Sequence, residues 1–324
     1  MLDILSAISD PPRFFPVVIF KAQKMHLLNK LIVSTMPLVP RRVVRYFAGR
    51  YIAGETIDDA IATVRQLNGE GACTTLDVLG EDVFTRDEAT ASREQSIQVL
   101  ETIAREKLDA NLSIKLTSLG LKVDKAFCCE NTGEILKVAA RLGIFVRFDM
   151  EDSTCTSDTI DVFRSLHRRF PDTGIVLQAY LHRTEDDARQ LVADGVGFRL
   201  CKGIYKERRE IAFQGREEVQ RNYLKVLELM LRGHAYVGIA THDSVLVDGA
   251  RTMIRDLGLR KDQYEFQMLL GVRPELRRTL IREGHKVRLY VPFGQHWYGY
   301  SLRRFKENPA VAGYVFKAIL RPNS

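Results

Sequence analysis

The residues best suited to chemistry stand at the ends of short apolar runs. These runs are rich in β-branched and aromatic residues, and almost all of them end in charged, amide or hydroxyl side chains: Asp77, Glu81, Lys115, Asp149, Glu151, Gln178, Arg199, Lys202, Thr241, His242, Asp243, Glu265, Gln267 and Tyr290. Burying charges without partners is costly, so folding alone does not explain the pattern. If the runs are parallel strands, their carboxyl ends meet at one edge and these side chains converge on a single site.

The elements that must hold these residues alternate along the chain from about residue 57. We expect strands at 72–80, 112–118, 144–150, 174–180, 196–202, 236–242, 263–269 and 286–293. Between them, stretches such as 56–71 and 131–143 space apolar residues three and four apart and carry a glycine near the end, which is typical of helices. Such alternation predicts parallel strands with helical crossovers, in the number that a closed (β/α)8 barrel needs.

An open, doubly wound sheet is the structural alternative. It usually carries G-x-G-x-x-G after its first strand, and here Gly195 and Gly197 are followed by Leu200 where the third glycine would stand. The chain has no internal repeat, no low-complexity tract and no linker rich in Gly, Pro or Ser. We therefore expect one barrel at 57–324, preceded by an N-terminal helical extension at 1–56.

Composition and cysteine usage exclude several classes of protein. The 324 residues are 45% hydrophobic and 27% charged, which is ordinary for a globular chain. The cysteines are odd in number and include no C-x-x-C, which argues against a disulfide framework and a zinc site: Cys73, Cys128, Cys129, Cys155 and Cys201. We expect no metal. With no secretory signal and no apolar stretch long enough to span a bilayer, we expect a cytoplasmic protein.

The net charge of +7 is unevenly distributed. No acidic residue stands between Asp10 and Glu55, whereas that window holds eight basic ones: Arg13, Lys21, Lys24, Lys30, Arg41, Arg42, Arg45 and Arg50. They flank apolar runs, as in segments that lie on anionic lipid. We therefore expect residues 13–50 either to contact the inner face of the membrane or to form a pair of helices whose basic side faces the solvent.

Nine motifs, in order, carry a resemblance to a known family. They are LDVLGE (76–81), SIKLTSLG (113–120), RFDMEDS (147–153), QAY (178–180), RLCKGIYKE (199–207), ATHD (240–243), EFQML (265–269), YVPFG (290–294) and WYGYSLRRFKENP (297–309). The set resembles the proline dehydrogenase family from about residue 50 to the C-terminus. The resemblance implies a distorted (β/α)8 barrel with noncovalent FAD. It also implies oxidation of L-proline to pyrroline-5-carboxylate, with electrons passed to a quinone at a membrane surface.

The same resemblance suggests which residues hold the substrate. Lys115, Arg303 and Arg304 resemble a clamp for the proline carboxylate, which suits the planar fork of guanidinium groups. The residues that resemble a wall for the pyrrolidine ring are Tyr205, Leu269, Tyr290 and Tyr300. Asp149 resembles a buried carboxylate that neutralises and orients, and with Lys115 and Arg199 it makes up the expected catalytic set.

The cofactor residues are assigned by resemblance as well. Arg199 resembles the residue beside flavin N5, and Gln178 resembles a partner of the isoalloxazine edge. Further contacts along the dinucleotide are expected from Lys202, Gly203, Thr241, His242, Gln267, Arg304 and Glu307. Glu81 and Arg303 resemble an ion-pair gate over the substrate, although Glu81 can also be read as a carboxylate at a helix N-terminus.

Several positions depart from the family pattern, and two other functions stay open. Cys201 and Ile204 replace small or aliphatic residues, His296 replaces an aspartate, and Gly299 replaces a proline. One alternative is a dehydrogenase for hydroxyproline or another cyclic amine, but the bulk of Tyr300 favours proline itself. The other is a nucleic-acid-binding protein, which a pI of about 9.1 permits but which no helix-turn-helix or ribbon segment supports.

Overall fold

The computed structural model describes residues 44–45, 49–80 and 82–301. The chain divides into two compact units, of which Gly49–Trp297 is the larger. The second unit consists of Met1–Ala48 with Tyr298–Ser324, and only its residues 44–45 and 298–301 are described. The predicted boundary at residue 57 and the N-terminal extension stay predictions.

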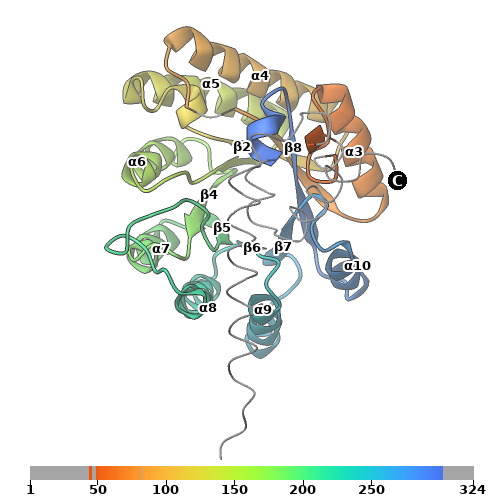
Figure 1. The fold of residues 1–324 in the computed structure, drawn as a ribbon, viewed down its shortest axis with the longest axis vertical. Coiled ribbons are helices and arrows are strands. Elements are labelled where there is room, and N and C mark those ends of the chain that lie inside the picture. The colour runs from red at the N-terminus through yellow and green to blue at the C-terminus, as the bar shows by residue number, and fades with distance from the viewer. Residues whose placement is uncertain (1–43, 46–48, 81, 302–324) are drawn as a thin grey trace, which may run out of the picture. The chain divides into compact units, whose positions relative to one another are not determined.

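Eight parallel strands close into a barrel in chain order (Figure 1). They are β1 Cys73–Val78, β2 Ala110–Ile114, β3 Val146–Phe148, β4 Thr173–Gln178, β5 Gly197–Cys201, β6 Val237–Ala240, β7 Tyr264–Leu269 and β8 Val287–Phe293. The last strand pairs with the first, Thr75 lying opposite Tyr290, and this pairing closes the sheet. All eight predicted strands exist, and the (β/α)8 barrel is confirmed.

One helix precedes the first strand, others connect successive strands, and together they surround the barrel (Figure 1). They are α3 Ile57–Gly69, α4 Arg86–Arg105, α5 Lys125–Leu142, α6 Thr156–His167, α7 Thr184–Ala193, α8 Arg216–Arg232, α9 Ser244–Asp256 and α10 Pro274–Arg282. Their starts are set by side chains that satisfy free backbone N–H groups. Thr56 with Asp59 and Thr85 with Glu88 form capping boxes at the starts of α3 and α4. Because α4 begins at Arg86, the carboxylates of its first turn are Asp87 and Glu88, and Glu81 is not one of them.

The second strand is shorter than the sequence predicted. It ends at Ile114, and a 3-10 turn, η2 Thr117–Leu119, follows. Polar side chains divert the backbone here: Ser118 Oγ donates to Lys115 O at 2.7 Å, and Thr117 N donates to Glu151 Oε2 at 3.1 Å. Local bonds of this kind compete with a strand ladder. Lys115 therefore projects just beyond the end of β2.

The two faces of the strands are both buried, but they differ in chemistry. Outward residues such as Phe148, Phe198 and Phe266 are apolar and inaccessible to water, and burying each stabilises the fold by about 1.5–3 kcal/mol. The inward face carries charged and amide groups, and glycines leave room for them. A Cβ on Gly174 would lie 2.3 Å from Arg147 Nη1, and one on Gly238 would lie 2.3 Å from Gln267 Nε2.

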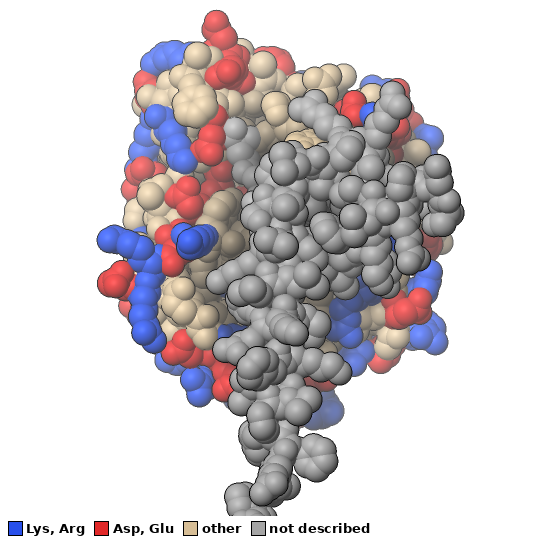
Figure 2. Space-filling view, viewed as in Figure 1, with Lys and Arg blue, Asp and Glu red and all other residues tan. Residues whose placement is uncertain are grey.

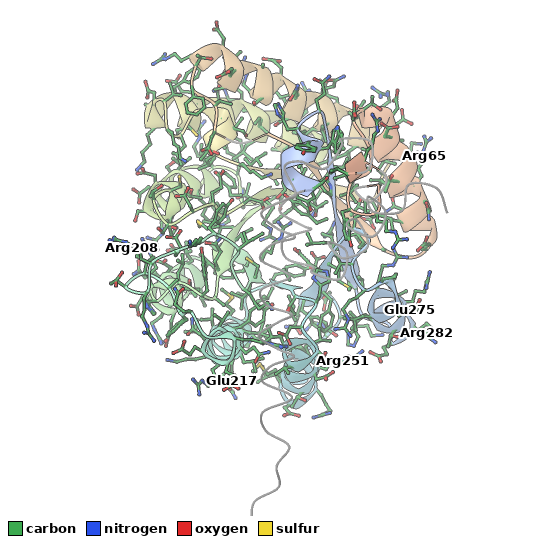
Figure 3. The ribbon with its side chains drawn as sticks, in the orientation of Figure 1. Arg65, Arg208, Glu217, Arg251, Glu275 and Arg282 are labelled. Atoms are coloured by element: carbon green, nitrogen blue, oxygen red, sulfur yellow. The ribbon has the colours of Figure 1, made fainter. Side chains whose placement is uncertain are left out.

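The charged residues on the surface are separate from this interior set. Arg65 of α3, Glu217 of α8 and Glu275 of α10 lie at the periphery (Figure 3). Both signs of charge are interspersed over the described part of the visible face (Figure 2). Among the described residues, no helix has the length and apolar character to cross a membrane.

Candidate active site

An ion pair between Asp149 and Arg199 lies inside the barrel. Arg199 Nη1 is 2.7 Å from Asp149 Oδ1, and both residues are 8% exposed. Asp149 also accepts hydrogen bonds from Ser113 Oγ at 2.6 Å and from Tyr290 Oη at 2.8 Å. These residues come from β2, β5, β8 and the end of β3. Because β3 and β5 are not adjacent strands, their side chains meet only within the barrel.

A second buried pair, Lys115 with Asp77, lies beside the first. Lys115 Nζ bonds to Asp77 Oδ1, and it lies 3.5 Å from the hydroxyl of Tyr290. Tyr290 therefore links this pair to Asp149. Burial raises the pKa of Asp77, and the charge of Asp149 adds to this, while Lys115 acts in the opposite direction. Burial and the charge of Asp149 thus favour a bound proton on Asp77, against the attraction of Lys115.

A third pair, Glu265 with Arg288, continues the network on the other side of Arg199. Arg199 Nε donates to Gln267 Oε1 at 2.5 Å, and Gln267 Nε2 donates to Glu265 Oε1 at 2.6 Å. Glu265 Oε1 also accepts from Arg288 Nε at 2.8 Å. The residues of this hydrogen-bonded network lie within or just after six strands, β1, β2, β3, β5, β7 and β8.

The structure brings together five of the residues predicted for catalysis, substrate and cofactor: Lys115, Asp149, Arg199, Gln267 and Tyr290. Arg199 also lies over the ring of Tyr290, with its guanidinium carbon 5.1 Å from the ring centre. A cation at this distance from a ring is stabilised by the electrons of its face. The planar Arg199 is thus held at two edges and against one face.

The predicted cofactor residues that the structure describes lie within or directly after β4, β5, β6 and β7. Gln178 Nε2 donates to Met150 O at 3.3 Å, whereas its Oε1 is buried and has no hydrogen-bond partner among the described residues. An unpaired buried acceptor is costly, and it suits a ligand that donates a hydrogen bond there. A flavin ring carries such a donor, so Gln178 fits the predicted role.

Lys202 and Gly203 follow β5 directly. Lys202 Nζ lies 3.3 Å from Asp243 Oδ2, and its side chain is 41% exposed, so its charge reaches the solvent. Asp243 accepts from Gln220 Nε2 at 2.9 Å as well. Gly203 has φ +105°, and a Cβ there would lie 2.1 Å from the ring of Tyr180. The backbone turn and Tyr180 thus require a glycine independently of any ligand.

Thr241 and His242 follow β6. His242 Nε2 accepts a hydrogen bond from the backbone N of Leu269 at 3.0 Å, which joins the ends of β6 and β7. An imidazole that accepts at Nε2 carries its proton on Nδ1. Thr241 is 5% exposed, and its Oγ1 accepts from Asp243 N at 3.1 Å. His242 therefore also positions Leu269, one of the predicted ring-packing residues.

The remaining predicted residues are divided between loops and undescribed parts of the chain. Tyr205 lies half-buried in the loop after β5. Tyr300 belongs to the second unit. The gate and clamp residues Glu81, Arg303, Arg304 and Glu307 lie outside the described residues. Their roles stay predictions. In the part of the chain that the structure describes, no cluster of His, Cys, Asp and Glu could hold a metal ion.

Sequence reasoning named no role for Asp77, Ser113 or Glu265, although each lies in the network. Asp77 and Glu265 belong to the polar set at the strand ends, so the signal was available in the sequence. What the sequence lacks is the pairing, because Lys115 and Asp77 are 38 residues apart and Arg288 and Glu265 are 23 apart.

Comparison with known proteins agrees with this geometry. A family model described as "Proline dehydrogenase" matches residues 60–317. The chain belongs to the proline dehydrogenase family. It is 38% identical over 277 residues to "Proline dehydrogenase 2" of Bacillus subtilis (strain 168), covering 86% of this chain and 91% of that protein. It is 34% identical over 279 residues to "Proline dehydrogenase" of Deinococcus radiodurans, covering 85% and 90%.

Solved structures share the fold of this family member. The crystal structure of proline utilization A (PutA) from Bdellovibrio bacteriovorus inactivated by N-propargylglycine superposes with a TM-score of 0.78 at 22% identity. The match covers 86% of this chain and 34% of that one, so the chain spans about a third of the length of that protein. At this identity the likeness concerns the fold, and it agrees with the closed barrel described above.

Proposed function

We propose that this chain is a flavin-dependent dehydrogenase that oxidises L-proline to pyrroline-5-carboxylate. In this reaction a hydride leaves C5 of the pyrrolidine ring with its electron pair, the amine loses a proton, and a C=N bond forms. Bound noncovalently, FAD supplies the hydride acceptor, a function that no side chain provides. The observation that carries the proposal is the buried network of Lys115, Asp149, Arg199 and Tyr290 at the carboxyl ends of the strands.

Arg199 contributes a fixed positive charge where negative charge develops. Its guanidinium is held by Asp149 and Gln267, so little reorganisation is needed during the reaction. Within the described part of the chain, its Nη2 makes no hydrogen bond, which leaves N–H donors for a ligand. In the proposed enzyme these donors would bind at N5 of the flavin.

Gln178, Lys202, Gly203, Thr241, His242 and Gln267 would hold the cofactor. The unpaired Oε1 of Gln178 suits the edge of the isoalloxazine, and the half-exposed Lys202 suits a phosphate. Arg304 and Glu307 are proposed to complete this set. Leu269, Tyr205, Tyr290 and Tyr300 are proposed as the wall around the ring, with Lys115, Arg303 and Arg304 at the carboxylate and the pair of Glu81 with Arg303 as a gate.

The electrons must then leave the protein, and we propose a quinone as their acceptor. A lipid-soluble acceptor requires a visit to the bilayer. The basic residues between 13 and 50 are proposed to make that contact, on the inner face of the membrane of the cell, with the protein otherwise cytoplasmic. Basic residues near an anionic surface contribute about 1 kcal/mol each.

The test is the visible spectrum of the purified protein. We expect flavin absorption, its loss when L-proline is added without oxygen, and its return with a quinone. In rapid-mixing experiments Arg199→Ala should slow flavin reduction at saturating proline by roughly a hundredfold while weakening proline binding less, since the charge appears only as the hydride moves. A protein that stays colourless after reconstitution with FAD, or whose flavin proline does not reduce, overturns the proposal.

A further inference from the structure

The side-chain amide of Gln267 is held in one of two possible orientations. Its Oε1 accepts from Arg199 Nε, and its Nε2 donates to Glu265 Oε1 at 2.6 Å. Residues two apart on a strand share a face, so Glu265 and Gln267 both point into the barrel. If the amide turned over, its Nε2 would meet the N–H of Arg199, and two donors would face each other. Something must therefore fix the amide.

Glu265 has the properties that this requires. It is 1% exposed, and its two oxygens accept from Arg288 Nε at 2.8 Å and from Tyr236 Oη at 2.8 Å, with Lys286 Nζ at 3.5 Å. Burial raises the pKa of Glu265, but Arg288 and Lys286 more than offset this and hold the pKa at about 2. An ionised carboxylate only accepts hydrogen bonds, so it admits the Nε2 end of Gln267 and excludes Oε1.

The consequence for Arg199 is geometric. Its guanidinium is anchored at Nε by Gln267 and at Nη1 by Asp149. Two anchors on adjacent edges define the plane of the group, whereas one anchor leaves rotation about it. Loss of the Gln267 contact therefore affects where the remaining N–H donors point, even though Asp149 still neutralises the charge.

We propose that Glu265 is a positioning residue, which acts through the amide of Gln267 to hold the guanidinium of Arg199 in its reactive orientation. The inference rests on the proposed function, in which Arg199 stabilises negative charge on the flavin. It extends the site from the end of the barrel to the buried pair of Glu265 and Arg288. It also gives this pair a role that stabilising the fold does not require, because apolar residues of similar volume often stabilise a protein as well as a buried ion pair does.

The experiment removes the pair as a unit. Glu265→Leu with Arg288→Met cuts the contact to Gln267 and leaves neither charge without its partner. In the full-length holoenzyme we expect flavin reduction at saturating proline to slow about tenfold, as for other outer-shell partners of a reactive group, with the KM for proline within twofold. We also expect a lower flavin midpoint potential, because a misaligned Arg199 stabilises the reduced form less.

Two comparisons separate this role from a general loss of structure. Gln267→Leu should lower the potential as well, and adding the pair replacement to it should cause no further change. Tyr236→Phe is the matched control: it removes a hydrogen bond from Oε2 of Glu265 while leaving the contact to Gln267, so it should keep the wild-type potential and reduction rate. If the pair variant does not fold, Gln267→Leu alone keeps the inference testable, because it cuts the same link to Arg199 Nε: a lowered potential is expected, and an unchanged potential in this variant overturns the inference.

Three results would overturn the inference while the proposed function stands. They are an unchanged potential in the pair variant, additive shifts when that pair is removed together with Gln267, and a shift in Tyr236→Phe as large as in the pair variant. A wild-type protein that binds no flavin overturns the proposed function and this inference together. The spectrum of the wild-type protein therefore distinguishes the two failures.

Discussion

Asp149→Asn removes one negative charge from the centre of the site and leaves its shape unchanged. In the structure, Oδ1 of Asp149 accepts from Ser113 and Arg199, and Oδ2 accepts from Tyr290. An asparagine can keep its oxygen toward Ser113 and Arg199, and its amide can donate to the hydroxyl of Tyr290. The hydrogen bonds therefore survive in number, and the loss is the charge that neutralises Arg199.

The magnitude follows from the burial of that pair. Both side chains are about nine-tenths buried, so solvent screens the lost attraction only weakly. Removing one partner of a buried pair costs about 3–5 kcal/mol. Removing one hydrogen bond to the same charged oxygen, as in Ser113→Ala, costs about 1.5–3 kcal/mol. We therefore expect Asp149→Asn to destabilise the protein clearly more than Ser113→Ala.

Urea unfolding, followed by far-UV circular dichroism, measures both variants under the same conditions. Arg199→Met completes a double-mutant cycle with Asp149→Asn, and we expect a coupling energy of about 1–3 kcal/mol. The reasoning is refuted if Asp149→Asn costs no more than Ser113→Ala, or if the two changes at Asp149 and Arg199 are additive. Either result would mean that the pair does not bear the charge balance assigned to it.

Three further predictions concern residues outside the buried network. Arg303→Lys or Arg304→Lys should raise the KM for proline roughly tenfold to a hundredfold with FAD still bound, since a lost charge-assisted hydrogen bond costs about 1.5–3 kcal/mol; unchanged KM values would contradict the clamp. Tyr300→Ser should raise the ratio of kcat/KM for hydroxyproline to that for proline, and an unchanged ratio would remove Tyr300 from the ring pocket. The full chain should sediment with anionic vesicles but not with neutral ones, and the bound fraction should fall at high salt. A variant whose basic residues between Arg13 and Arg50 are neutralised should not sediment with anionic vesicles. If that variant binds as well as the wild type, the segment only covers the barrel as a pair of helices.

The fold was predictable because separate features of the sequence all indicate the same barrel. Apolar runs such as 196–202 are too short for helices, the stretches between them have helical spacing, and the glycine pattern of a doubly wound sheet is missing. The closing pair of β1 with β8 followed from the number of strands. The end of β2 was misplaced because the sequence continues with Leu116 and Thr117, which suit a strand, and only the contact with Glu151 reveals the turn.

The sequence predicted several residues of the site, but it did not predict which of them form ion pairs and hydrogen bonds with one another. Arg199, Asp149 and Lys115 stood out because charged residues at strand ends need a reason. Their partners did not, because Asp77 and Glu265 are brought to them by the curvature of a closed sheet. A residue such as Gly203 shows the converse: the sequence suggested an approach to a ligand, and the structure adds that Tyr180 already fills the space of a side chain.

The order of charges within the network bears on where the substrate finds its counter-charge. Three buried ion pairs follow one another, Asp77 with Lys115, Asp149 with Arg199 and Glu265 with Arg288. The neutral side chains Tyr290 and Gln267 link them, and the two cations that could face the substrate, Lys115 and Arg199, are each already paired with a carboxylate among the described residues. A substrate carboxylate that approached Lys115 would compete with Asp77 for it, at a cost in desolvation that one shared lysine does not repay. An additional cation is therefore needed at the site, which is the physical reason to expect Arg303 and Arg304 there.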